Sequence, residues 1–93
     1  MNKEELVLAV STSADISRKE AEIACDTVFG AIKAALRAGD KAQIVGFGTF
    51  EVKTRASRMG RNPKTGEQVL IPARKVPAFK PGKPLKEAVD EVV

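Results

Sequence analysis

The sequence predicts an α+β fold, in which helices and strands occupy separate stretches of the chain. Residues 1–39 repeat apolar side chains at helical spacing, and residues 40–82 change to the alternation of strands. A turn sequence lies near the middle of a long basic stretch and separates two predicted strands, which predicts a protruding β-hairpin. The predicted organisation is one domain, residues 1–93, with a two-helix base (1–39), body strands (40–52 and 76–82), a β-arm (53–75) and a C-terminal helix (83–92).

Two helices are predicted in the base. Asn2 can cap the first, and Ser17 with Glu20 has the form of a capping box that begins the second. Gly39 lies where a residue of left-handed conformation ends a helix. The apolar face of the second helix is rich in alanine, so another helix could approach it closely.

The strand region begins at Asp40 and contains the pair Gly46 and Gly48. A G-x-G pair suggests a nucleotide-binding loop, but a third glycine is absent and Phe50 continues a strand instead of opening a helix. We interpret the glycines as a sharp turn that directs Phe47 into an apolar interior. All four aromatic residues are Phe, so a surface that stacks single-stranded bases is disfavoured.

The size of the chain predicts a dimer. Ninety-three residues bury a modest core, and about a third of them are assigned to a projecting polar hairpin. The remaining apolar side chains exceed what one subunit can cover. The predicted dimer core consists of Phe29, Leu36, Ile44, Phe47, Phe50 and Phe79.

Positive charge is concentrated in residues 53–86, which hold ten Lys and Arg against the single acid Glu67, a net charge of +9. Residues 1–52 carry −2 and residues 87–93 carry −3, which gives the overall +4. A basic surface that is merely solvated is one interpretation. A segment of one sign on a near-neutral body is more typical of a protein that binds a polyanion.

The arm and the last helix both carry features of a nucleic-acid interface. The tip, residues 62–66, has proline at an early corner and glycine at its end, and Pro72 suits a ribbon with free edges. Pro84 begins a helix with lysines at its N-terminal end and acids towards its C-terminal end, the reverse of what the helix dipole favours. Free backbone amides and lysine side chains at a helix N-terminus favour the binding of a phosphate group.

The sequence predicts no enzyme. It contains no histidine, no metal-ligand cluster and no cysteine with a base partner, so we expect no catalytic residue, metal or cofactor. Cys25, the single cysteine, lies in an apolar helical stripe and is interpreted as a buried thiol. No apolar run approaches a membrane span, and we expect a soluble, intracellular protein.

These residues also carry a family resemblance over essentially the whole chain. Gly46-Phe47-Gly48-Thr49-Phe50, Gly60-Arg61-Asn62-Pro63 and Val76-Pro77-Ala78-Phe79-Lys80 resemble the bacterial HU and integration host factor family, and the last stretch resembles homodimeric HU most. The resemblance implies an intertwined dimer with a helical base, a short antiparallel sheet and two arms. It further implies that the arms wrap the DNA minor groove and that Pro63 wedges between base pairs.

From this resemblance we expect a nucleoid-associated, cytoplasmic protein that bends and compacts double-stranded DNA with little sequence specificity and prefers bent, nicked or gapped duplex. By resemblance Lys3 lies near Asp26, and we expect the two to form a surface ion pair with which DNA competes. An RNA-binding or ribosome-associated basic module is the alternative, and the degree of sequence preference stays open. The predicted DNA-binding residues are Lys53, Arg55, Arg58, Arg61, Asn62, Pro63, Lys64, Arg74, Lys75, Lys80, Lys83 and Lys86.

Overall fold

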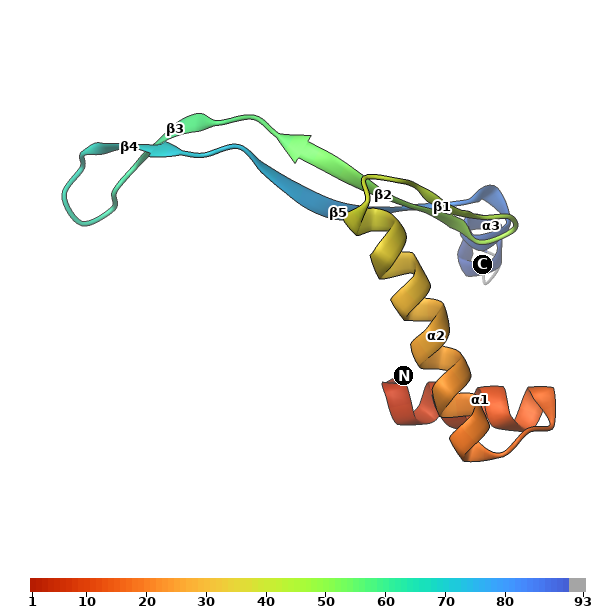
Figure 1. The fold of residues 1–93 in the computed structure, drawn as a ribbon. Coiled ribbons are helices and arrows are strands. Elements are labelled where there is room, and N and C mark those ends of the chain that lie inside the picture. The colour runs from red at the N-terminus through yellow and green to blue at the C-terminus, as the bar shows by residue number, and fades with distance from the viewer. Residues whose placement is uncertain (91–93) are drawn as a thin grey trace. The chain divides into compact units, whose positions relative to one another are not determined.

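A computed structural model describes residues 1–90 and confirms the α+β class. The chain divides into two compact units, residues 1–35 and the part from Leu36 onwards (Figure 1). Positions 91 and 92 of the predicted last helix lie outside the described residues. The elements are α1 (Lys3–Ala14), α2 (Arg18–Arg37), β1 (Ala42–Ile44), β2 (Gly48–Arg55), β3 (Arg58–Arg61), β4 (Gln68–Ile71), β5 (Arg74–Pro81) and α3 (Lys83–Asp90).

Both predicted helix starts in the first unit are confirmed. The Glu5 N–H donates to Asn2 Oδ1 at 2.9 Å and caps α1. At the start of α2 the Glu20 N–H donates to the Ser17 hydroxyl, and the Ser17 N–H donates to the Glu20 carboxylate, both at 3.1 Å. These reciprocal bonds satisfy amides that have no partner inside the helix. Gly39, at φ +78°, follows the end of α2 as predicted.

The core of the first unit is small. Val7, Ala21 and Cys25 are its buried apolar side chains, so the prediction of a buried thiol is confirmed. Beside this core the expected ion pair is present, with Lys3 Nζ 2.8 Å from the Asp26 carboxylate. The hydrogen bond with Asp26 raises the pKa of Lys3. Both partners stay about half exposed.

In the second unit β1, β2 and β5 form an antiparallel sheet with β2 in the centre. Gly46, at φ +85°, closes the turn between β1 and β2, so this part of the glycine interpretation is confirmed. Phe47 is 46% exposed in the single chain and not inside an apolar interior. The Phe47 ring packs against that of Phe79, with centroids 5.5 Å apart, and the Phe79 ring in turn lies 4.7 Å from that of Phe50.

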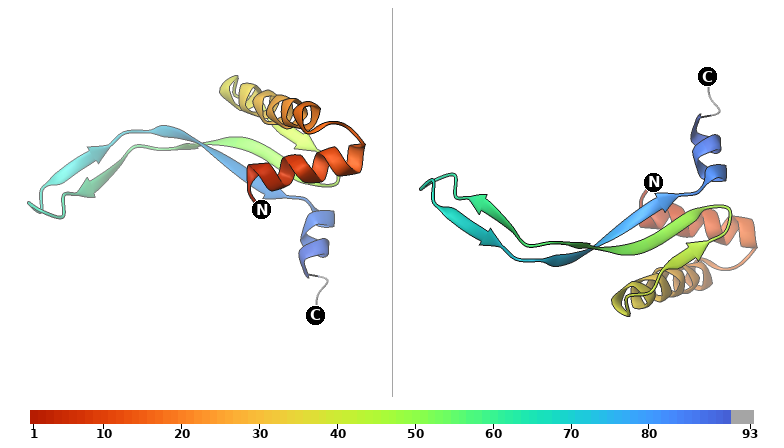
Figure 2. Two further views of the ribbon diagram at one scale, coloured as in Figure 1. Left: turned by 90° about the horizontal axis from the view of Figure 1, so that it is seen from below. Right: turned by 90° about the horizontal axis from the view of Figure 1, so that it is seen from above.

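The arm is the two-stranded sheet β3–β4, which continues the β2–β5 pair beyond an interruption at residues 56–57 and 72–73 (Figure 2). The predicted boundary between body and arm does not coincide with a break in pairing, because the β2–β5 ladder continues to Arg55 opposite Arg74. Pro72 has no N–H to donate, which explains why regular pairing stops there instead.

None of the helices described in residues 1–90 combines the length and the apolar composition that crossing a bilayer requires.

Candidate nucleic-acid interface

One face of the β2–β5 pair is basic. Side chains alternate between the two faces of a sheet, and the register places Lys53 and Arg55 on the same face as Arg74 and Lys80. Lys75 pairs with Thr54 and therefore belongs to the opposite face. Of the five predicted DNA-binding residues on β2 and β5, the structure therefore places four on one face and Lys75 on the other.

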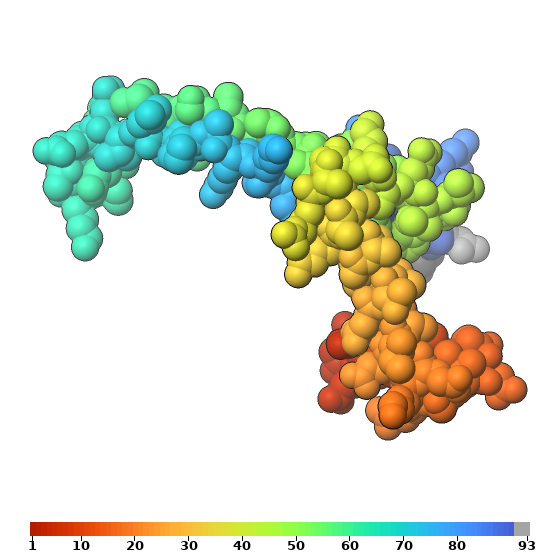
Figure 3. Space-filling model, in the orientation of Figure 1, coloured from red at the N-terminus to blue at the C-terminus, as the bar shows by residue number. Residues whose placement is uncertain are grey.

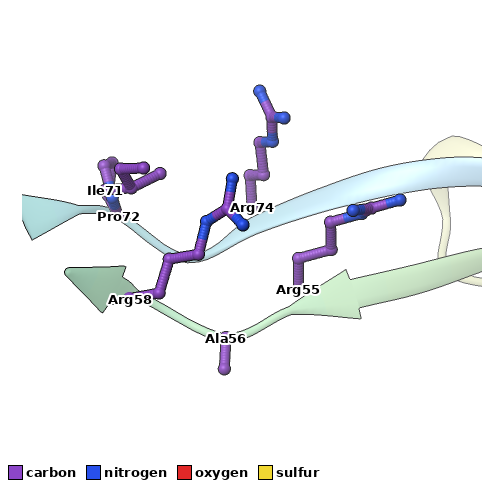
Figure 4. A pocket seen from close by; sticks show the side chains of 6 residues that line it. All are labelled: Arg55, Ala56, Arg58, Ile71, Pro72 and Arg74. Atoms are coloured by element: carbon purple, nitrogen blue, oxygen red, sulfur yellow. The ribbon is translucent and has the colours of Figure 1, made fainter. Parts of the chain in front are cut away.

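Three arginines converge where the ladder is interrupted. Arg55, Arg58 and Arg74 line an open hollow of about 280 Å³ together with Ala56, Ile71 and Pro72. In Figure 4 the three arginine side chains extend from the ribbon on the side away from Ala56. No acid lines the hollow, so the guanidinium groups repel one another until an anion neutralises them. Guanidinium groups are well suited to phosphate oxygens.

The arm ends in an ordered turn that presents Pro63. The Gly66 N–H donates to the Asn62 carbonyl at 2.7 Å, and the Lys64 N–H donates to Asn62 Oδ1 at 2.9 Å. The predicted site residue Asn62 therefore shapes the turn with its side chain. Pro63, Lys64 and the neighbouring Arg61 are exposed, and Figure 3 shows the arm of the second unit as a narrow ribbon of atoms.

The predicted lysines of α3 occupy its first turn or follow closely. The helix has no acid in its first turn and no basic residue in its last described turn, so the reversed charge order is confirmed over residues 83–90. Lys83 Nζ lies 3.9 Å from the Glu87 carboxylate, but its side chain is 87% exposed. An exposed pair of this kind binds weakly and leaves the ammonium available to an external anion.

The net charges of the chain segments did not identify Lys41 and Glu51 as part of the interface, because both residues belong to residues 1–52, which carry a net charge of only −2. In the structure Glu51 lies on the basic face, with its carboxylate 4.0 Å from the Lys41 ammonium and 4.0 Å from the Lys80 ammonium. The signal available in the sequence was positional, because a hairpin with a turn at residues 45–47 brings Lys41 opposite Glu51. Among residues 1–90 no group of His, Cys, Asp and Glu is arranged to hold a metal ion.

The predicted dimer-core residues are partly or largely exposed in the single chain. The exposed fractions are 54% for Phe29, 43% for Ile44, 46% for Phe47 and 39% for Phe79, while Leu36 and Phe50 are half-buried. Phe29 also borders an apolar groove of about 190 Å³ in the first unit. This groove is lined by Leu6, Val10, Ala24, Cys25, Val28 and Phe29.

Comparison with known proteins identifies relatives of the whole chain. The family model described as bacterial DNA-binding protein matches residues 1–90. DNA-binding protein HU of Geobacillus stearothermophilus is 61% identical over 89 residues, which cover 96% of this chain and 99% of the relative. DNA-binding protein HU 1 of Bacillus subtilis is 58% identical over 89 residues, covering 96% of this chain and 97% of the relative.

Solved structures of HU proteins also match nearly the whole chain. An Anabaena HU–DNA cocrystal structure matches with a TM-score of 0.90 and 47% identity, covering 96% of this chain and 97% of that one. HU from Thermotoga maritima matches with a TM-score of 0.69 and 39% identity over 96% of this chain and 98% of that one.

Proposed function

This chain belongs to the bacterial DNA-binding protein family, and from that membership we propose that it is an architectural protein of the cytoplasmic nucleoid. It binds double-stranded DNA with little sequence specificity, and it bends and compacts the duplex. The observation that carries the proposal is the arm, a two-stranded ribbon whose exposed Arg58 and Arg61 lead to an exposed proline. Its likeness to a chain from an HU–DNA cocrystal supports the same ligand.

Each arm lies in the minor groove in this proposal. A two-stranded ribbon is narrow, and arginines are favoured where negative potential is concentrated. The hydrogen-bonded turn around Asn62 presents the apolar ring of Pro63 at the end of the ribbon. An apolar wedge between base pairs replaces part of the lost stacking, and unstacking a step costs a few kcal/mol that the wrapped arms offset. DNA that is already nicked, gapped or bent needs less deformation and binds more tightly.

The protein acts as a homodimer in this proposal. Within residues 1–90 the buried apolar side chains are Val7, Ala21 and Cys25, whereas Phe29 and Phe47 are about half exposed. The apolar groove of the first unit is an appropriate surface for a second copy of the chain. Two subunits would supply two arms, which is the number needed to hold a bent duplex on both sides of its centre.

A binding titration tests the proposal against the RNA-binding alternative. The protein is titrated into labelled linear duplex DNA, nicked duplex of the same sequence and double-stranded RNA. We expect tighter binding to the nicked than to the linear duplex, and weaker binding to the RNA. If the dimer neutralises about six to ten phosphates, the affinity for linear duplex falls about 10³- to 10⁵-fold between 50 and 200 mM salt. A preference for RNA or a flat salt titration would reject the proposed function.

Replacing Pro63 by Ala tests the wedge. Affinity for linear duplex is mostly electrostatic, so Pro63→Ala should keep most of it but lose much of the bend and of the preference for nicked DNA. Fluorescence transfer between dyes at the two duplex ends measures the bend. Pro72→Ala is the matched control, because Pro72 lies at the interruption of the ladder and not at the tip. An unchanged bend in Pro63→Ala would reduce the role of Pro63 to that of a turn residue.

A further inference from the structure

The basic face of the β1-β2-β5 sheet contains one carboxylate shared by two lysines. Lys41 Nζ lies 4.0 Å from Glu51 Oε2, and Lys80 Nζ lies 4.0 Å from Glu51 Oε1. Each carboxylate oxygen therefore faces a different ammonium group. The two lysines come from opposite edges of the sheet, since Lys41 precedes the edge strand β1 and Lys80 belongs to the other edge strand, β5.

The three side chains differ in their freedom to move. The Glu51 side chain is 14% exposed, whereas those of Lys41 and Lys80 are 72% and 68% exposed. The carboxylate is confined by its position on the central strand, and the ammonium groups can turn outwards on their flexible stems. This differs from the Lys3–Asp26 pair, in which both side chains are more than half exposed and either partner can leave.

We propose that Lys41 is a further phosphate-binding residue and that Glu51 restrains DNA affinity by holding Lys41 and Lys80 in the free protein. The inference rests on the proposed function, because its ligand is the DNA duplex. Lys80, Lys53 and Arg55 share this face of the sheet, so a duplex that contacts them passes close to Lys41. A phosphate must then compete with the fixed carboxylate for each ammonium, and two lysines with one carboxylate present a net charge of +1 in place of +2.

The sign of one substitution separates this restraint from a structural role. Glu51→Gln keeps the size of the side chain and removes its charge. If Glu51 only supports the sheet or orients the lysines, the variant binds DNA equally well or more weakly. If Glu51 is a restraint, Glu51→Gln binds linear duplex more tightly, by roughly threefold or more at low salt, because a repulsive charge is lost and two ammonium groups are released.

Lys41 is tested by titrating DNA at several salt concentrations with Lys41→Ala and with Lys41→Ala combined with Glu51→Gln. In the Glu51→Gln background, removal of Lys41 should lower the magnitude of the salt slope by about one for each Lys41 that binds a phosphate. In the wild-type background the decrease should be smaller, because the carboxylate already competes for that ammonium. This difference is a double-mutant coupling between positions 41 and 51.

Matched controls account for the change in net charge. Glu22→Gln and Lys33→Ala make the same charge changes at exposed positions of α2 outside the sheet, and each should alter affinity less than its counterpart. Circular dichroism verifies that every variant is folded. Because Lys41 is 72% exposed, Lys41→Ala provides a test even if Glu51→Gln fails to fold.

The outcomes distinguish this inference from the proposed function. If the wild-type protein binds duplex with a steep salt dependence but Lys41→Ala changes neither affinity nor slope in any folded background, Lys41 does not bind phosphate and the inference is wrong. Equal or weaker binding of duplex by folded Glu51→Gln also overturns it. If the wild-type protein itself fails to bind duplex DNA, the proposed function has failed instead.

Discussion

Gly48 is a position at which the sheet leaves no room for a side chain. A Cβ placed there would lie 2.6 Å from the Lys80 carbonyl oxygen and 2.6 Å from the ring of Phe79. The first of these atoms is backbone, so the clash is relieved only if β2 and β5 move apart. Glycine is therefore required at position 48 for a steric reason, the close contact between β2 and β5. The turn itself depends on Gly46.

We expect Gly48→Ala to lower the free energy of unfolding by about 1–3 kcal/mol, the usual cost of overpacking. Gly30→Ala is the control, because a Cβ at position 30 meets nothing within 4 Å and Ala is favoured over Gly in a helix by up to about 1 kcal/mol. Denaturant unfolding at one fixed protein concentration measures both variants. Equal stability of Gly48→Ala and the wild type would contradict the steric argument.

Single residues were predictable where their role depends on near neighbours in the sequence. Asn2, the Ser17–Glu20 pair and Gly39 all act within four residues, and the structure confirms each of them. The group formed by Lys41, Glu51 and Lys80 was not predicted, because it depends on the register of two strand pairs at once.

At the scale of elements, the start of α2 makes stability depend on pH. The Ser17 backbone N–H, and then its side chain, hydrogen-bond the Glu20 carboxylate and lower its pKa from 4.5. A carboxyl group whose pKa is lower in the folded state contributes stability that is fully present above 4.5 and is lost as the pH falls through the folded-state pKa.

Glu20→Gln should therefore reduce stability more at neutral pH than in acid. The difference in unfolding free energy between wild type and variant should be constant above the unfolded-state pKa of 4.5 and shrink below it. Thermal unfolding over a series of buffers measures this difference. Glu22→Gln, at an exposed position of the same helix, is the control. A difference that does not vary with pH would exclude the capping box as its origin.

The charge order of α3 predicts separate effects on folding and on binding. Lys86 lies near the positive end of the helix dipole, where a cation is unfavourable. Lys86→Ala should therefore leave thermal stability unchanged or slightly raised. The same variant should reduce the magnitude of the salt slope of DNA binding by about one for each phosphate that Lys86 neutralises in the wild type. A clear fall in melting temperature would show that Lys86 stabilises the fold.

The arm was predictable as an element, but its pairing was only partly so. Its tip sequence predicts a turn, and the bond from the Gly66 N–H to the Asn62 carbonyl closes one at that place. Pro72 was interpreted as a sign of a ribbon with free edges, and in the structure it also marks the interruption of the ladder. Sequence alone does not give the residues opposite Pro72 until the register of the whole hairpin is known.

At the scale of the whole molecule, the small core predicts that folding and dimerisation are coupled. Phe29 is 54% exposed in one chain, so in a monomer Phe29→Asp would be a surface change within about 0.5 kcal/mol. In a dimer the same change buries an unpaired charge. We expect Phe29→Asp to abolish the folded dimer, as measured by equilibrium sedimentation and circular dichroism.

Ile23→Asp is the matched control, because Ile23 lies on the same helix and is 58% exposed. This variant should remain a folded dimer. A folded wild-type monomer at micromolar concentration, or a folded Phe29→Asp variant, would reject the coupling. Chain length and apolar content predict a dimer and the residues of its core, but which of these apolar faces meet depends on the placement of a second chain.

The interruption between the β2–β5 ladder and the arm also constrains how arms of different length can arise. Arg55 pairs with Arg74 and Arg58 with Ile71, so two residues on each strand separate the ladders and the register is the same on both sides. Insertion of one residue in one strand would turn every side chain beyond it to the other face. Arms can therefore lengthen or shorten without disturbing their charged faces only by matched changes of an even number of residues in both strands, and an alignment gap of one residue on a single strand would indicate a bulge.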